Sequence, residues 1–177
     1  MSSYIAERYA GVLSKEDTVQ LFEMLTEKVQ GNKSKAARLC DLTGKTTYDW
    51  AKVKYVKLAT RQKVLAASLN IDFLYTVDYL VKRSNDRATD ILRTLLGAIF
   101  DQAVLTESAE VFKDALARFL ELRRQYSGLI RDQIEDEFSD MMDTLREKCS
   151  QLSVQVPEET IDDLTARELL DAIPTIG

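Results

Sequence analysis

Helix-breaking residues are scarce in this chain, and that scarcity limits the folds it can adopt. Only 6 glycines and 2 prolines occur in 177 residues, although these residues are the usual interruptions of regular structure. Apolar residues recur at spacings of three and four, as in Val19, Phe22, Leu25 and Val29, which is the period of one helix face. No segment alternates between apolar and polar residues as a strand would. We therefore predict an all-α fold.

Residues that favour helix ends give approximate boundaries. Ser14 is expected to cap a helix over residues 15–30, and Asp72 a helix over residues 73–83. Three other helices are expected over residues 4–13, 61–69 and 87–105.

The apolar pattern after residue 107 is long for a single helix and continues to about residue 150. Because Ser127-Gly128 is the one plausible kink, we expect either a helical hairpin or one helix of roughly forty residues or more. From residue 130 the apolar stripe narrows, which is typical of a helix that packs against a single partner helix. We predict a dimerisation seam formed by Ile130, Ile134, Phe138, Met141 and Leu145.

Three regions follow from these patterns. We predict a helix-turn-helix region over residues 1–83 and long amphipathic helices over residues 87–152 that form a helical dimerisation or packing region. Residues 153–177 are expected to form an acidic tail with a short helix.

The helix-turn-helix prediction rests on residues 31–50, where two short helices flank a turn at Asp41. Ala37 is small enough to let the two helices approach closely, and Leu42 would fill the gap between them. The second helix would begin near Thr43 and run on toward Val56. Such a helix, projecting polar and basic groups, suits the major groove of DNA.

The net charge of −5 hides a strong asymmetry along the chain. Residues 31–63 carry nine bases and two acids, a net charge of +7, whereas residues 96–177 carry eight bases and eighteen acids, a net charge of −10. Because a groove-binding surface depends on the local field, the basic block supports DNA binding in a protein that is acidic overall.

The residues from Gly31 to Leu39, followed by Thr46-x-Tyr48, resemble the C-terminal helix-turn-helix of the Fis family. That module also ends bacterial enhancer-binding activators, where it binds DNA as a dimer. Asp41 replaces the turn glycine of the family, and Asp tolerates left-handed geometry better than most residues. Gly44 stands where the family usually has a basic residue. The resemblance is limited to residues 31–50 and implies local fold and DNA binding.

We predict DNA contacts at ten residues. The lysines would contact phosphates, while Lys45, Thr46 and Tyr48 would contact base edges, with Asp49 able to accept from a cytosine amino group. The predicted contacts are Lys33, Ser34, Lys35, Thr43, Lys45, Thr46, Tyr48, Lys52, Lys54 and Lys57.

The predicted function is a sequence-specific transcription regulator that binds double-stranded DNA as a homodimer. The alternative is an all-α interaction or scaffold protein whose acidic C-terminal half binds a protein partner. The C-terminal helices could also hold a small effector. These readings differ in whether the basic block or the acidic half carries the function.

Catalytic, metal and cofactor chemistry find little support in the residues. Histidine is absent, and no phosphate-binding loop or Ser- or Cys-centred motif is present, so we predict neither an enzyme nor a metal or cofactor site. Carboxylates over residues 132–143 are interpreted as a solvated helix face, and Trp50 as a core residue. Cys40 and Cys149 are expected to be buried thiols, with a disulfide between them as the alternative. No apolar run approaches the roughly 18 residues of a membrane span, so we expect a cytoplasmic protein without membrane contact.

Overall fold

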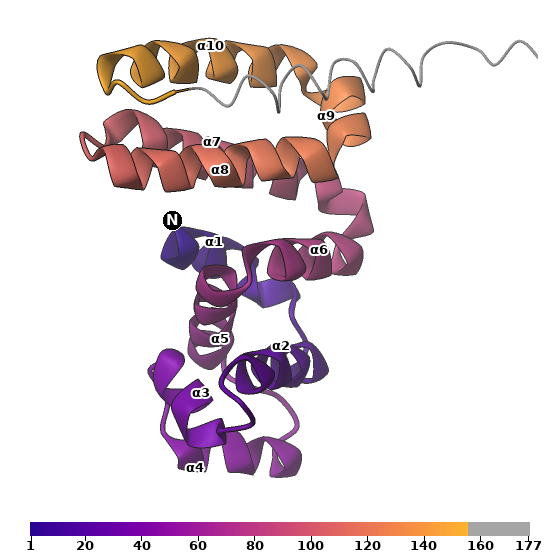
Figure 1. The fold of residues 1–177 in the computed structure, drawn as a ribbon. Coiled ribbons are helices and arrows are strands. Elements are labelled where there is room, and N and C mark those ends of the chain that lie inside the picture. Colours follow the sequence, from indigo (N-terminus) through magenta and orange to yellow (C-terminus); the bar gives the residue numbers. More distant parts are fainter. Residues whose placement is uncertain (156–177) are drawn as a thin grey trace, which may run out of the picture. The chain divides into compact units, whose positions relative to one another are not determined.

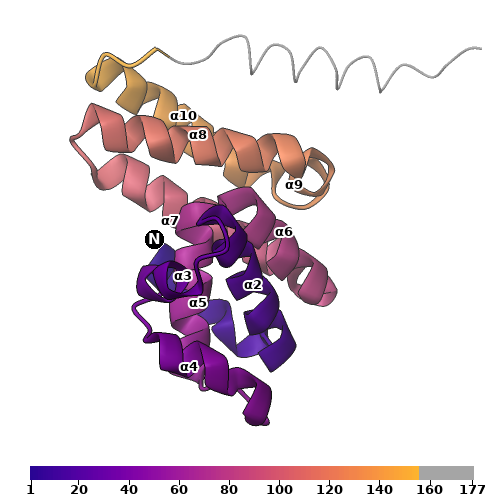
Figure 2. The same cartoon turned by 60° about the horizontal axis from the view of Figure 1, so that its bottom comes forward.

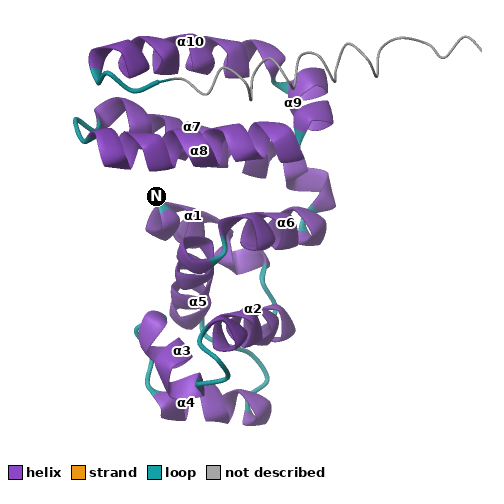
Figure 3. Cartoon of the chain, in the orientation of Figure 1, coloured by secondary structure: helices purple, strands orange, loops and turns teal. Residues whose placement is uncertain are grey.

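The computed structural model describes residues 1–155, without the side chains of Tyr48 and Asn85. These residues form helices joined by short loops, and no strand occurs among them (Figure 1, Figure 3). The all-α prediction is therefore confirmed for the described part of the chain. None of its helices is long and apolar enough to cross a membrane. The short helix predicted in the tail 153–177 falls outside the described residues.

Two compact units divide the chain, residues 1–98 and 99–177. The boundary lies inside a helix, whereas the sequence suggested a break between helices at residues 84–86. That break does not end the first unit, because the next helix still packs within it. The Tyr9 hydroxyl, for example, donates to the carbonyl oxygen of Asp90 at 3.3 Å.

The first unit is built around one central helix, α5, which packs against α1, α2 and α6 (Figure 1, Figure 2). Its α-helices are α1 (Ser2–Tyr9), α2 (Lys15–Lys28), α3 (Lys33–Leu39), α4 (Gly44–Tyr48), α5 (Leu58–Ile71), α6 (Phe73–Arg83) and the first part of α7 (Ala88–Leu105). Three short 3-10 helices connect them: η1 (Ala10–Val12), η2 (Asp49–Lys52) and η3 (Asn85–Arg87).

Helix α5 is enclosed because its apolar residues do not keep to one face. Val64, Leu65 and Leu69 are each 0% exposed, and Ala67 and Ser68 between them are buried as well. Residues so close in sequence point to different sides of a helix, so a helix of this composition must be covered on several sides. The Ser68 hydroxyl donates to the carbonyl oxygen of Val64 at 2.8 Å, so this buried donor is paired.

A tight turn at the end of α2 places α3 directly after it. Gln30 and Gly31 both adopt left-handed backbone, with φ of 60° and 80°, and the Gly31 amide donates to the Thr26 carbonyl oxygen at 2.9 Å. This is how helices commonly end when a glycine follows them. The Asn32 side chain then accepts from the Lys35 amide at 2.9 Å and caps α3.

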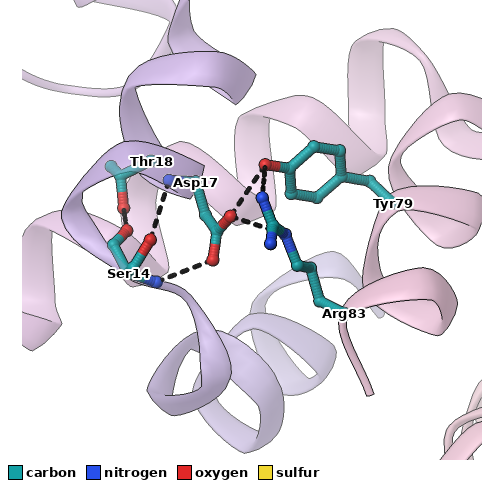
Figure 4. A network of polar contacts seen from close by, with 5 residues as sticks. All are labelled: Ser14, Asp17, Thr18, Tyr79 and Arg83. Atoms are coloured by element: carbon teal, nitrogen blue, oxygen red, sulfur yellow. Dashed lines mark hydrogen bonds and ion pairs between the residues drawn. The ribbon is translucent and has the colours of Figure 1, made fainter. Parts of the chain in front are cut away.

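A buried carboxylate joins the start of α2 to α6 (Figure 4). Asp17 is 4% exposed; it accepts from the Ser14 amide at 2.9 Å and the Tyr79 hydroxyl at 2.8 Å, and its Oδ1 lies 2.7 Å from Arg83 Nε. The predicted cap at Ser14 is confirmed as a capping box. Burial raises the pKa of Tyr79, which keeps its hydroxyl protonated as a donor to Asp17.

The second unit contains a helical hairpin. Of the two alternatives predicted for the long apolar pattern, the hairpin is therefore correct and the single long helix is not. The hairpin consists of α8 (Ala109–Gln125), α9 (Ser127–Gln133) and α10 (Glu135–Gln151). Tyr126 and Ile134 interrupt the helices, and α9 connects α8 to α10 (Figure 1). The rings of Phe119 on α8 and Phe138 on α10 stack with centroids 4.8 Å apart.

The predicted dimerisation seam is largely buried inside a single chain. Ile130 and Leu145 are 0% exposed, and Ile134 and Phe138 are 2% and 6% exposed; Met141 alone among the five is half-buried. A narrow apolar stripe indicates one partner helix, but it does not distinguish a helix of the same chain from a helix of a second copy. Here the same chain supplies the partner, so these four residues are unavailable to a second copy while the hairpin is folded.

Candidate nucleic-acid interface

The segment predicted as a helix-turn-helix forms two short helices, α3 and α4, around a left-handed turn. Ala36 and Ala37 are both 0% exposed, so α3 is packed closely along its small residues. Asp41 has a φ of 51° and makes the turn, after which the Leu42 amide donates to the Ala37 carbonyl oxygen at 2.8 Å. Lys63 Nζ, from α5, donates to the Asp41 carbonyl oxygen at 3.0 Å and fastens the turn to the central helix.

Helix α4 begins where the sequence predicted, directly after Thr43. Threonine hydroxyls form hydrogen bonds within this helix and at its start. Thr43 and Thr46 share a hydrogen bond of 3.0 Å, and Thr47 donates to the Gly44 carbonyl oxygen at 2.8 Å. These local bonds support a helix of only five residues, in which the Lys45 side chain is exposed.

The prediction that this helix runs on toward Val56 is wrong. The α-helix ends at Tyr48 and the chain continues as the 3-10 helix η2. Trp50, which is 6% exposed, packs edge-on against Phe22 of α2 with ring centroids 5.2 Å apart. The 3-10 helix therefore carries a large aromatic ring that is buried against α2. The interpretation of Trp50 as a core residue is confirmed.

None of the nine predicted DNA-contacting side chains that the structure describes is buried. Thr46 is half-buried, and the side chain of Tyr48 is not among those described. The exposed residues are Lys33, Ser34, Lys35, Thr43, Lys45, Lys52, Lys54 and Lys57. They belong to α3, the turn before α4, α4, η2 and the loop that follows η2.

Asp41 and Asp49 are the two carboxylates within residues 31–63. Asp41 forms an ion pair with Lys63 at 3.3 Å, and Asp49 is half-buried. Residues 50–71 contain no acid and carry five bases. The region is therefore cationic at neutral pH, and an anionic partner would find an attractive field there.

A groove of about 680 Å³ beside α4 limits the extent of that field. Its lining combines apolar groups, including Phe22 and Trp50, with the carboxylates Glu16, Glu23 and Glu27 of α2. Those carboxylates would repel a nucleic-acid backbone. No sequence signal marks this groove, because α2 and η2 lie far apart along the chain and meet only through the fold.

Sequence reasoning also missed the residues that anchor the loop between η2 and α5. Lys15 Nζ donates to the Val53 carbonyl oxygen at 2.9 Å, and Arg61 Nε donates to the Val56 carbonyl oxygen at 3.0 Å. The acceptor in each case is a backbone carbonyl, so no side-chain pattern could have pointed to these contacts.

Both cysteines are free and buried, as predicted. Burial raises the pKa of Cys40 to about 12, so the thiolate that a nucleophile or a metal ligand requires is scarce near neutral pH. No group of three His, Cys, Asp or Glu residues in the described part of the chain is placed to hold a metal ion. Comparisons of the chain with protein-family models, curated proteins and solved structures gave no match.

Proposed function

We propose that this protein is a transcription regulator that binds double-stranded DNA through α3, the turn at Asp41 and α4, acting together as a helix-turn-helix. One coincidence supports this proposal. Exposed lysines lie within the closely packed α3–α4 segment, with its left-handed turn, and continue along the chain through η2 and the loop after it. We call these the lysine set: Lys33, Lys35, Lys45, Lys52, Lys54 and Lys57.

The lysine set would supply affinity without sequence preference. Each lysine that neutralises a phosphate releases a condensed counterion, so the logarithm of the binding constant falls linearly with the logarithm of the salt concentration. With roughly six phosphate contacts, affinity would fall about a thousandfold between 50 and 200 mM salt. Such a protein binds any duplex at low salt and depends on base contacts for selection.

Base contacts would come from α4 and from Asp49 at the start of η2. Lys45 can donate to guanine, Thr46 can contact either type of base pair, and Asp49 can accept from a cytosine amino group; Tyr48 keeps the role that the Fis resemblance implies. Because α4 is short, one such helix reads few base pairs. Two copies of this helix-turn-helix, related by a two-fold axis in a dimer, would reach adjacent major grooves and double the number of base pairs contacted.

A salt-titrated binding assay on mixed-sequence duplex DNA tests the proposal. We expect binding at low salt that weakens as salt is raised, and weaker binding by the double variant Lys45→Ala, Lys52→Ala. Absence of binding at low salt, or equal affinity of the double variant, would contradict the proposal.

The alternative function, binding of a basic protein partner by the acidic half, is favoured by one observation on α10. This helix carries six acids and two bases, and its acidic residues Asp136, Asp140, Asp143 and Glu147 are exposed. If the alternative holds, a lysine-rich probe peptide should bind the full chain and lose affinity with Asp136→Asn plus Asp140→Asn, while duplex DNA does not bind.

A further inference from the structure

The loop between η2 and α5, residues 53–57, presents an aromatic ring to solvent between two members of the lysine set along the chain. Tyr55 is 73% exposed, and its neighbours Lys54 and Lys57 are exposed as well. No other large apolar or aromatic side chain described in the first unit is as open to water, and the next most exposed is Tyr4 at 52%. An exposed ring between cations suggests a ligand that has both anionic and flat or apolar surfaces.

The loop that carries Tyr55 is fastened on both sides of it. On one side, Lys15 Nζ binds the Val53 carbonyl oxygen at 2.9 Å. On the other side, the Val56 side chain is 3% exposed and its carbonyl oxygen accepts from Arg61 Nε at 3.0 Å.

Arg61 ties the same loop to the N-terminal helices. Its Nη1 donates to the carbonyl oxygens of Ala10 at 3.2 Å and Leu13 at 2.9 Å. The guanidinium of Arg61 therefore joins α5 to the loop at Val56 and to the segment from Ala10 to Leu13. Its planar arrangement of several N–H donors suits this role. Only Lys54 and Tyr55 project between the two anchored points. Little backbone entropy remains to be lost when these side chains meet a ligand, because the backbone is already held on both sides.

The charge of the loop itself points to a polyanion as the ligand. No acid occurs from residue 50 to residue 71, so no carboxylate of the loop or of α5 within that range faces Tyr55. A single exposed ring suits a double helix better than an unpaired strand, since proteins that bind single strands stack successive bases on several aromatic rings. The other tyrosines with high exposure, Tyr4 and Tyr75, belong to α1 and α6 and not to this loop.

We propose that Tyr55 is a second DNA-contacting element, which binds the sugar-phosphate backbone of the duplex whose major groove receives α4. This inference rests on the proposed function. The phenol hydroxyl donates to a phosphate oxygen, the ring packs on a deoxyribose, and Lys54 and Lys57 neutralise the adjacent phosphates. Tyrosine is among the side chains that make such contacts in protein–DNA complexes, where they fix the register of the protein on the duplex.

The test compares Tyr55→Ala and Tyr55→Phe with the wild-type chain on mixed-sequence duplex DNA. Tyr4→Ala is the matched control, because Tyr4 is another exposed tyrosine of the same unit, at 52% exposure. We expect Tyr55→Ala to bind about tenfold more weakly and Tyr55→Phe about threefold more weakly, in proportion to the hydrogen bond and packing lost, with Tyr4→Ala unchanged. Emission of the sole tryptophan, Trp50, checks that each variant is folded.

The dependence on salt separates the role of the ring from that of the lysines. Tyr55 carries no charge, so Tyr55→Ala should keep the wild-type slope of log affinity against log salt. A reduced slope would overturn the proposal, because the ring would then act only by holding lysines in place.

Three further outcomes are distinguishable. If the wild-type chain does not bind duplex at low salt, the proposed function fails, and this inference fails with it. If the wild-type chain binds and Lys45→Ala, Lys52→Ala weakens binding while Tyr55→Ala does not, only this inference fails. If Tyr55→Ala weakens binding of a single strand of equal length more than binding of the duplex, Tyr55 stacks on bases and the backbone contact is wrong.

Discussion

Two residues of the α3–α4 segment, Asp41 and Gly44, depart from the family pattern that the segment resembles, and the structure gives each a physical meaning. Asp41 holds the left-handed conformation at a φ of 51°, where that pattern has glycine, so the turn survives the replacement. Gly44 leaves room at the start of α4. A Cβ built there would meet only Ser34 Oγ, at 3.9 Å, which is an ordinary van der Waals contact.

The space at Gly44 permits a gain-of-function test. We predict that Gly44→Arg folds normally and binds duplex DNA about three to ten times more tightly, because it adds one phosphate contact at the start of α4. The matched control is Gly11→Arg, which adds the same charge to the same unit at an exposed glycine where a Cβ would meet no atom within 4 Å. Equal affinity gains from both variants, measured by fluorescence anisotropy, would mean that net charge alone is responsible and that α4 has no special role.

The roles of single residues were predictable where the signal was local. The core position of Trp50 followed from its spacing, and Ser14 and Asp72 were placed correctly as helix caps. The anchoring role of Arg61 was not predictable, since its acceptors at Ala10 and Leu13 are backbone carbonyls about fifty residues away in sequence.

At the scale of elements, helix boundaries set by local sequence signals were predicted correctly, and boundaries set by other features were not. Helices that begin at a side-chain cap were placed within a few residues, because Ser, Asn and Asp bond the first free amides of a helix. The breaks at Tyr126 and Ile134 have no side-chain cap, so the pattern from α8 to α10 read as nearly continuous. Just after the early end of α4, Trp50 packs against Phe22 of α2, a contact that only the fold brings together.

The hairpin of α8, α9 and α10 gives a prediction that distinguishes an internal core from a dimer seam. Phe138 stacks on Phe119, and Arg123 lies over its ring at 4.9 Å while bonding Glu135 at 3.0 Å. We expect Phe138→Ala to lower the free energy of unfolding of this unit by about 3 kcal/mol, the cost of a cavity in place of a buried ring.

Denaturation followed by far-UV circular dichroism measures that cost. Met141→Ala, a half-buried position of the same predicted seam, should cost less than about 1.5 kcal/mol, since less of its surface is removed from water. A Phe138→Ala variant of normal stability but halved molecular mass would contradict the internal role and restore the seam.

At the scale of the whole molecule, charge is divided unevenly along the chain. Residues 31–63 are strongly basic and residues 96–177 strongly acidic, so two molecules in like orientation would repel through their acidic halves at low salt. The sequence predicted this division directly, because charge can be counted without knowing the fold. It did not predict which residues would face a second copy, since burial within the chain decides that.

We still propose a dimer, with an interface other than the buried seam, because paired heads explain how so short a reading helix could select a site. Multi-angle light scattering on the full chain should give a mass of about 40 kDa, twice the 20.1 kDa of one chain. The mass should hold when salt is raised to screen the acidic halves. A mass near that of one chain at every protein and salt concentration tested would contradict the dimer. DNA binding by a monomer would still have to be tested separately.

The central claim, that the lysine set binds phosphates of duplex DNA, is tested most directly by the slope of log affinity against log salt. The slope should be about −5 for the wild-type chain and smaller in magnitude by about 2 for Lys45→Ala, Lys52→Ala, since each lost phosphate contact removes about 0.9. The control Lys113→Ala, Lys148→Ala, which removes the same charge from the second unit, should keep the wild-type slope. A wild-type slope near zero, or equal slopes for the two double variants, would contradict the account.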